Sequence, residues 1–196
     1  LVKTDRVQGI LGRVTSYSSS TGGRYSRLCT MVGRTLGLFD DIRPLAHSLT
    51  AARSALYLGR DVLFPVALEG ALKLKELSYI HAEGFASGEM KHGPIALIEE
   101  GLPVVALLAA DEVMGKAASN LQEAAARGGR IILITEERAA STVDFAESVI
   151  TVPNVDPLLA PVLLTVPVQI LAYLTAFEKG TDVDQPRNLA KSVTVE

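Results

Sequence analysis

The residues with the clearest chemical potential lie between positions 65 and 94 of the 196-residue chain. Glu69, Lys73 and Glu76 are spaced i, i+4 and i+7, and His92 follows in the sequence His-Gly-Pro. A helix turns by about 100° per residue, so the first three side chains fall within about 60° of one another on one helical face. Carboxylate, amine and imidazole groups are the ones that carry protons to and from a sugar. A proton-transfer site is therefore one interpretation of this stretch.

A purely structural explanation of this pattern is also open. The Glu69–Lys73 and Lys73–Glu76 pairs have ordinary i, i+4 and i, i+3 spacing, and such pairs stabilise a helix by about 0.2–0.5 kcal/mol each without any function. His92 before Gly-Pro is equally suited to ending a helical segment. The pattern alone favours this structural explanation, so catalysis needs further evidence from the sequence.

The elements that must position these residues alternate between apolar strands and amphipathic helices. Such alternation predicts parallel β-α-β units, and we expect an α/β fold with a flavodoxin-like parallel sheet and helices on both faces. Gly59 opens the turn after the first strand, at the end of the sheet where ligand crevices form. The predicted strands cover residues 55–60, 103–109, 130–135 and 148–152, and the predicted helices cover residues 40–54, 65–80, 113–127 and 157–177.

The composition narrows the functional class. Apolar residues make up 48% of the chain and charged residues 21%, which is typical of a globular domain. The net charge of −3 gives no reason to expect nucleic acid as a partner. The single cysteine, Cys29, excludes a disulfide framework and a Cys/His metal cluster, and it fits a reducing cytoplasm. Residues 157–177 are uncharged and long enough to span a membrane, but their prolines favour a buried core helix.

The chain divides into two parts of different character. Residues 1–39 are interpreted as a linker or as the remnant of a preceding domain, and residues 40–196 as the folded domain. Within the first part, residues 15–23 (TSYSSSTGG) are rich in Ser, Thr and Gly. Hydroxyl and backbone N–H groups at a helix start bind phosphate, so a phosphate cradle is one interpretation of this tract. A flexible linker is favoured, because no convincing buried strand precedes the tract.

Two longer segments carry a family resemblance. The segment ALEGALKLKELSYIHAEGF, with GEMKHGPIALI after it, precedes the final residues DVDQPRNLAKSVTVE. Together they resemble the second sugar-isomerase (SIS) domain of the glutamine:fructose-6-phosphate amidotransferase family, the glucosamine-6-phosphate synthases. The resemblance covers residues 40–196, and it implies an SIS domain with a C-terminal tail that takes part in catalysis.

The resemblance implies an aldose–ketose isomerisation coupled to amination at C2, which converts fructose 6-phosphate to glucosamine 6-phosphate. Lys191 in the tail would form a Schiff base with the open-chain ketone. Glu76 would move the proton between C1 and C2 as a general base. His92, supplied by the neighbouring subunit, would assist ring opening, and Lys73 would orient or tune these groups.

The resemblance also implies the surroundings of this chemistry. Three further residues are expected to contact the sugar or to shape its site: Glu69, Asn188 and Ala190. No metal and no organic cofactor are called for. The expected partners are a glutaminase domain that supplies ammonia, a first SIS domain and a second copy of the chain. Because the family's phosphate-gripping residues belong largely to the first SIS domain, we expect the isolated chain to be weakly active or inactive.

Two alternatives to an enzyme remain open. The chain could be a non-catalytic phosphosugar-binding SIS module, as in regulators built on this fold, although residues 1–39 contain no recognisable helix-turn-helix for DNA. It could also be a structural half-domain that is stable only as a dimer. In that case the melting temperature would depend on protein concentration and not on sugar.

Overall fold

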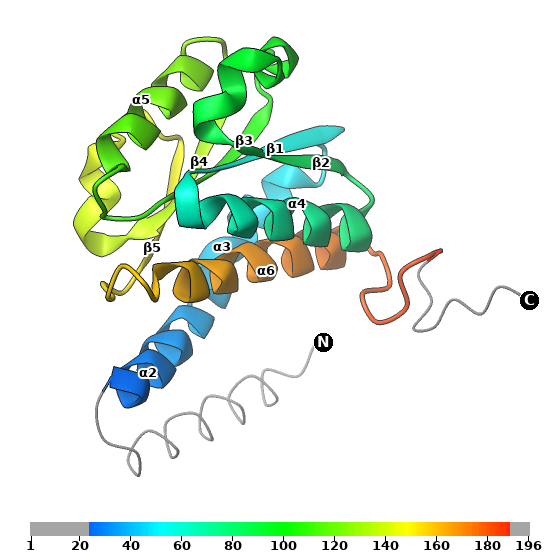
Figure 1. Ribbon diagram of the computed structural model, residues 1–196. Helices are drawn as coiled ribbons and strands as arrows, with labels where there is room; N and C mark the ends of the chain where they lie inside the picture. Colours follow the sequence, from blue (N-terminus) through cyan, green and yellow to red (C-terminus); the bar gives the residue numbers. More distant parts are fainter. Residues whose placement is uncertain (1–23, 189–196) are drawn as a thin grey trace, which may run out of the picture.

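Five parallel strands form one sheet in the computed structural model, which describes residues 24–188 (Figure 1). Each strand is parallel to its neighbours. The spatial order β2-β1-β3-β4-β5 is the flavodoxin-like order, so the predicted fold class is confirmed. The strands are β1 (Ser54–Gly59), β2 (His81–Ala86), β3 (Pro103–Leu108), β4 (Arg130–Glu136) and β5 (Ser148–Val152).

Helices cover both faces of the sheet (Figure 1). On one face, α3 (Phe39–Leu49), α4 (Phe64–Ser78) and α6 (Ala160–Glu178) form a core with strand residues such as Tyr57 and Val105. On the other face, α5 (Met114–Ala125) and η2 (Ser87–His92) pack over residues such as Leu58 and Val104, accompanied by the short segments η3 (Pro94–Leu97) and η4 (Glu137–Thr142). Because each central strand contributes to both cores, it is apolar throughout.

The sequence predicts four of the five strands and misses β2. The segment HAEGFA contains no continuous apolar run, because β2 lies at the edge of the sheet and pairs with β1 alone. Gly84 lets α4 approach this strand closely, since a Cβ atom there would lie 2.9 Å from the backbone of Ala67. The edge position and the close helix contact are tertiary features that a short sequence window does not reveal.

Two predicted helices end earlier than expected. The prediction of a helix through residues 50–54 is wrong, because α3 ends at Leu49 and the chain enters β1 at Ser54. Thr50 closes the last turn by donating a hydrogen bond from Oγ1 to the carbonyl oxygen of His47 at 2.7 Å. Helix α4 begins with a proline in its first turn and ends at Ser78, after which Tyr79 takes a left-handed conformation with φ of 62°.

The prediction that the uncharged segment 157–177 forms a buried core helix is confirmed. Helix α6 is long and apolar enough to cross a membrane, but 61% of its most apolar window is buried inside the protein. It lies beside α4 and also contacts α3 and α2 (Arg24–Leu36). Its burial completes the core on the α4 face of the sheet, which fixes the position of the charged face of α4.

Part of the N-terminal segment also packs on this core. Helix α2 contacts α6, and its side chains Met31, Val32 and Leu36 lie against the buried cluster. The Ser/Thr/Gly tract at residues 15–23 lies outside the described residues, so its interpretation as a linker or a phosphate cradle stays a prediction.

Candidate active site

The charged face of α4 contains a close ion pair in the last turns of the helix. Lys73 Nζ lies 2.8 Å from Glu76 Oε2, and the two side chains are 33% and 26% exposed. The neighbours Leu74 and Ser78 are buried, so the helix holds the pair at the boundary between core and solvent. Within the described residues, the hydrogen bond of the Glu76 carboxylate is made by Oε2.

The protonation of Lys73 follows from these neighbours. Its hydrogen bond to Glu76 is the main cause of a raised pKa, and the charges of Glu76 and Glu69 add to it, while partial burial opposes them. Lys73 is therefore a cation at neutral pH and cannot serve as a base. In this arrangement its ammonium group holds a positive charge beside the carboxylate of Glu76.

Glu69 connects the same face to the neighbouring helix. Its Oε1 accepts a hydrogen bond from Nε2 of Gln169 in α6 at 3.2 Å. Glu69 also contributes to the electrostatic field at Lys73. The three residues predicted from their spacing are thus brought together on one face, beside the contact between α4 and α6.

His92 is not brought to this face. It is the last residue of η2, which packs against α5 on the other side of the sheet, held there by buried Met90 and by an ion pair of 2.8 Å between Lys91 and Glu123. The His92 side chain is 75% exposed, and its Nε2 lies 3.8 Å from Glu89 Oε2. Within one chain, His92 and Glu76 therefore belong to opposite faces of the sheet.

The C-terminal tail is described as far as Asn188. Asn188 is exposed and has a left-handed backbone with φ of 62°. Ala190 and Lys191, which the resemblance assigns to the site, lie outside the described residues. Their expected roles stay predictions.

The fold and the charged face can now be compared with known proteins. The family model for the SIS domain matches residues 48–179. The chain belongs to the SIS domain family. The match includes all five strands, the charged face of α4 and His92, whereas Asn188 lies beyond the matched residues.

Relatives of this SIS domain carry a consistent name. Isomerizing glutamine–fructose-6-phosphate aminotransferase from Agrobacterium fabrum is 59% identical over 156 residues, which cover 79% of this chain and 26% of the relative. The protein of the same name from Brucella abortus is 54% identical over 84% of this chain and 27% of its own length. The resemblance inferred from the motifs is confirmed, and the chain spans about a quarter of the length of these relatives.

Solved structures agree with this assignment. The C-terminal domain of glucosamine-fructose-6-phosphate aminotransferase from Francisella tularensis has a TM-score of 0.79 at 42% identity, covering 82% of this chain and 45% of that one. Tagatose-6-phosphate ketose/aldose isomerase from Escherichia coli has a TM-score of 0.67 at 20% identity, covering 87% and 49%. The second similarity shows the shared SIS fold alone.

The loop after β1 contains a residue with an unusual backbone conformation. Asp61 adopts a left-handed backbone with φ of 51°. Asp61 begins the short segment η1 (Asp61–Leu63) that leads into α4. Next to it, Arg60 is held by a hydrogen bond from Nη1 to Oδ1 of Asn120 at 3.1 Å. A positive φ is tolerated by Asp but suits Gly better, so Asp61 adopts a backbone conformation that Gly would take without strain.

The structure also places near the site residues that the sequence analysis missed. Tyr79, at the end of α4, accepts a hydrogen bond from the backbone N–H of Arg187 at 2.9 Å, across 108 residues of sequence. Thr181 Oγ1 lies 2.7 Å from the carbonyl oxygen of Leu77 in α4. Neither residue belongs to a recognisable pattern, and only the tertiary structure brings the tail to the end of the helix.

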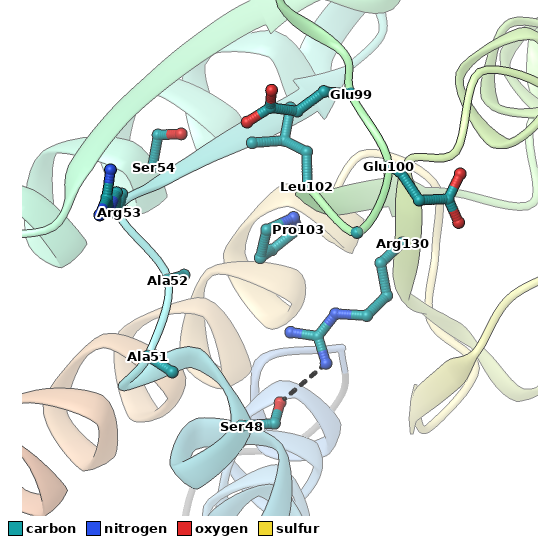
Figure 2. Close-up of a pocket in the computed structure, with 11 residues that line it drawn as sticks. Ser48, Ala51, Ala52, Arg53, Ser54, Glu99, Glu100, Leu102, Pro103 and Arg130 are labelled. Atoms are coloured by element: carbon teal, nitrogen blue, oxygen red, sulfur yellow. Dashed lines mark hydrogen bonds between the residues drawn. The ribbon is translucent and has the colours of Figure 1, made fainter.

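A hollow of about 330 Å³ lies at the amino ends of β1, β3 and β4 (Figure 2). Arg130 points across it toward Ser48 of α3, with Nη1 3.2 Å from the hydroxyl oxygen (Figure 2). None of the predicted site residues between positions 24 and 188 lines this hollow. Parallel sheets of this kind bind ligands beyond the carboxyl ends of their strands, so the hollow is separate from the candidate active site.

Proposed function

We propose that the chain is the isomerase-domain part of a glucosamine-6-phosphate synthase, which converts fructose 6-phosphate and ammonia from glutamine to glucosamine 6-phosphate. The name shared by relatives at 54–59% identity supports this proposal. The observation that carries it is the half-buried carboxylate of Glu76, oriented by Lys73 at 2.8 Å in the last turns of α4.

The proposed reaction assigns one step to each residue. After ring opening, the amine of Lys191 adds to the C2 ketone with loss of water, giving a Schiff base that ammonia then displaces. Glu76 removes a proton from C1 of the resulting imine and a proton is delivered to C2, while the C1 hydroxyl loses its proton and the nitrogen gains one. The double bond thereby moves from C2–N to C1–O, which leaves an amine at C2 and an aldehyde at C1.

His92 is proposed to assist ring opening in the site of a second copy of the chain. Its exposure and its place on the face opposite α4 keep it away from Glu76 of its own chain and accessible to another one. The proposal therefore includes a homodimer, together with a glutaminase domain and a first SIS domain in a longer protein. It also includes a cytoplasmic location, with which the single cysteine of the chain is compatible.

The first test is borohydride trapping with fructose 6-phosphate, followed by peptide mapping. We expect a hexose-phosphate adduct on Lys191 that is absent from Lys191→Ala and retained in Lys179→Ala, a change of an exposed lysine at the end of α6. The experiment is repeated on a longer protein in which a first SIS domain precedes the chain, because phosphate binding there positions the reacting carbons. If the longer protein also gives no adduct on Lys191, the proposed function is wrong.

The second test separates Schiff-base formation from proton transfer. In the longer protein, Glu76→Gln preserves the shape of the side chain and removes the base. We expect the Lys191 adduct to persist while isomerisation falls by about 10²- to 10⁴-fold, the usual contribution of general base catalysis. Glu99→Gln, an exposed glutamate remote from α4, serves as the control. Full isomerase activity in Glu76→Gln would contradict the assignment of the base.

A non-catalytic phosphosugar-binding module is the second candidate function. The separation of His92 from Glu76 within one chain favours it, because a single chain does not assemble all the proposed groups. This candidate predicts that fructose 6-phosphate raises the melting temperature of the longer protein without any turnover or any adduct on Lys191.

A further inference from the structure

The short segment η2, which ends at His92, is attached to α5 by contacts that the proposed reaction does not use. Met90 is fully buried in the core on the α5 face of the sheet. The next residue, Lys91, forms an ion pair with Glu123 of α5, with Nζ 2.8 Å from Oε1. The attachment therefore reaches the residue directly before the exposed imidazole of His92.

Arg60 provides a second attachment from the end of β1. Its Nη1 donates a hydrogen bond to Oδ1 of Asn120 in α5 at 3.1 Å. The same nitrogen lies 2.8 Å from the position that a Cβ atom on Gly88 of η2 would occupy. The absence of a side chain at Gly88 lets the guanidinium lie against the backbone of η2 while it bonds to α5. Arg60 therefore links the end of β1, η2 and α5.

The two attachments use neighbouring side chains of α5. Asn120 and Glu123 are three residues apart, so they lie next to each other on the helix surface. Another side of α5 packs in the core through three buried residues, Ala117, Leu121 and Ala124. The helix is thus a fixed support to which η2 is attached near its start, at Gly88, and near its end, at Lys91.

The position of His92 depends on these attachments because its own side chain is held weakly. Its ion pair with Glu89 has a distance of 3.8 Å and joins two largely exposed side chains. Exposed ion pairs of this kind contribute little to holding a conformation. After His92 the chain turns at Gly93, where φ is 154°, and enters η3. The backbone of η2 therefore sets the direction in which the imidazole leaves the chain.

We propose that Arg60 and Lys91 are positioning residues that hold η2 on α5 and thereby fix the direction of the His92 side chain. The importance of this direction rests on the proposed function, in which His92 assists ring opening in the site of a second chain. A misplacement of a catalytic group by about 1 Å can lower the rate by about 10²-fold, so the support of η2 matters for the reaction. Arg60 and Lys91 act only through η2.

The ring-opening step can be separated from the later steps by the choice of substrate. In the ring form of fructose 6-phosphate, the C5 oxygen is bonded to C2. Opening breaks this bond: the ring oxygen keeps the electron pair and takes up a proton, and the hydroxyl group on C2 loses its proton to become the ketone. 5-Deoxyfructose 6-phosphate lacks the C5 oxygen and cannot form this ring. It therefore enters the reaction after the step assigned to His92.

The first measurement is amide hydrogen exchange of η2 in the chain itself. Lys91→Glu and Glu123→Lys each replace the ion pair with two like charges, and the double variant restores the pair with the charges exchanged. We expect exchange in η2 to quicken about two- to fivefold in each single variant and to recover in the double variant. Arg60→Met removes a hydrogen bond of a charged group and should quicken it about tenfold. Lys116→Glu, a change of an exposed lysine of α5, is the matched control and should change nothing.

The second measurement compares the two substrates in the longer protein. We expect isomerisation of fructose 6-phosphate to fall about two- to fivefold in Lys91→Glu and about tenfold in Arg60→Met, with recovery when Glu123→Lys is added to Lys91→Glu. The rate with 5-deoxyfructose 6-phosphate should change less than about twofold, because His92 is not needed for it. His92→Asn, which removes the imidazole, is the reference for such a selective loss.

The two measurements separate this proposal from the proposed function. Unchanged exchange in Arg60→Met would overturn the proposal, and so would equal losses with the two substrates in Arg60→Met and Lys91→Glu when His92→Asn shows a selective loss. Equal losses in His92→Asn itself, or a longer protein that isomerises neither substrate, would instead count against the proposed function. The exchange of η2 would then still test the attachments.

Discussion

At the scale of single residues, the geometry of the candidate site depends on which side chain each charged group contacts. Lys73 and Glu76 form a direct pair that is only partly exposed, so its electrostatic effect exceeds that of an ordinary surface ion pair. His92 has no comparable partner within the described residues, because Glu89 lies 3.8 Å away and both side chains are largely exposed. The pair is therefore held in place within one chain, whereas the histidine side chain is exposed to solvent.

The cation of Lys73 is predicted to matter more for catalysis than for stability. Lys73→Met removes the charge that orients Glu76 and keeps the length of the side chain. We expect the free energy of unfolding to fall by less than about 1 kcal/mol, because the pair is partly solvated, while isomerisation by the longer protein falls at least about tenfold. Lys75→Met, a change of an exposed lysine on the same helix, is the control for denaturant unfolding and for activity. Equal activity of the two variants would contradict the assigned role.

The same pair predicts a pH dependence of stability. The pKa of Lys73 is raised above its ordinary value of 10.5, mainly by its hydrogen bond to Glu76. A raised pKa in the folded state means that the stabilisation is fully present below the ordinary value and is lost as the pH rises through the raised one. We expect the difference in unfolding free energy between the chain and Lys73→Met to be constant from about pH 7 to about pH 9 and to shrink only above about pH 10.5. Denaturant titrations across this range check the expectation, and a difference that shrinks below about pH 9 would contradict it.

Glu136 is a buried carboxylate with a structural role. It accepts hydrogen bonds from the backbone N–H groups of Ala110 and Val155 and from the guanidinium of Arg138, and its side chain is fully buried. Glu136→Gln replaces one accepting oxygen with a donor, so a buried N–H loses its partner, and we expect a loss of about 1–3 kcal/mol in thermal or denaturant unfolding. Glu137→Gln, a change at a half-exposed neighbour, is expected to alter stability by less than about 0.5 kcal/mol. Equal effects of the two changes would contradict the role of Glu136.

At the scale of elements, the contact between α4 and α6 sets the position of the charged face. Gly70 lies on the buried side of α4, and a Cβ atom at this position would lie 2.5 Å from Val168 of α6 and 2.6 Å from the ring of Tyr57. The absence of a side chain lets the two helices and the sheet meet closely. Glu69, next to Gly70, is then near enough to accept a hydrogen bond from Gln169.

Gly70→Ala is therefore predicted to destabilise the chain despite the better helix propensity of alanine. Overpacking of a well-packed core costs about 1–3 kcal/mol, whereas the gain in propensity is about 1 kcal/mol at most. We expect a lower midpoint of denaturant unfolding for Gly70→Ala. Gly115→Ala, in α5 with no atom within 4 Å of the added methyl group, is the matched control and is expected to be neutral or slightly stabilising. A stabilising Gly70→Ala would show that the two helices can separate without cost.

At the scale of the whole molecule, the sheet itself separates the two halves of the proposed site. Glu76 lies with the α4 core and His92 with the α5 core, so a complete site requires the second chain that we propose. The chain also spans about a quarter of the length of its relatives, so the proposed phosphate-binding domain would have to come from elsewhere in a longer protein. Under the proposed function, activity at this scale therefore requires assembly with a second chain and a further domain.

The shared site predicts that two inactive variants restore activity when they are mixed. In a heterodimer of Glu76→Gln and His92→Asn, one of the two sites receives an intact glutamate from one chain and an intact histidine from the other. Random reassortment makes about half of the dimers mixed, so about a quarter of the original activity should return. The measurement is the isomerase rate of the longer protein after the two variants are unfolded and refolded together, with separately refolded variants as the control. A mixture as inactive as its components would contradict the shared site.

The sequence by itself determined the features that depend on local periodicity. Four of the five strands, the position of α4 and the common face of Glu69, Lys73 and Glu76 all follow from apolar runs and helical spacing.

The tertiary structure decided the features that join residues far apart in the sequence. Strand β2 exists because β1 offers it a pairing edge and Gly84 admits α4, neither of which is visible in the segment HAEGFA. The contact between Tyr79 and Arg187 spans 108 residues, and the separation of His92 from Glu76 depends on which face of the sheet each element covers. Such relations between distant residues are fixed only when the whole core packs.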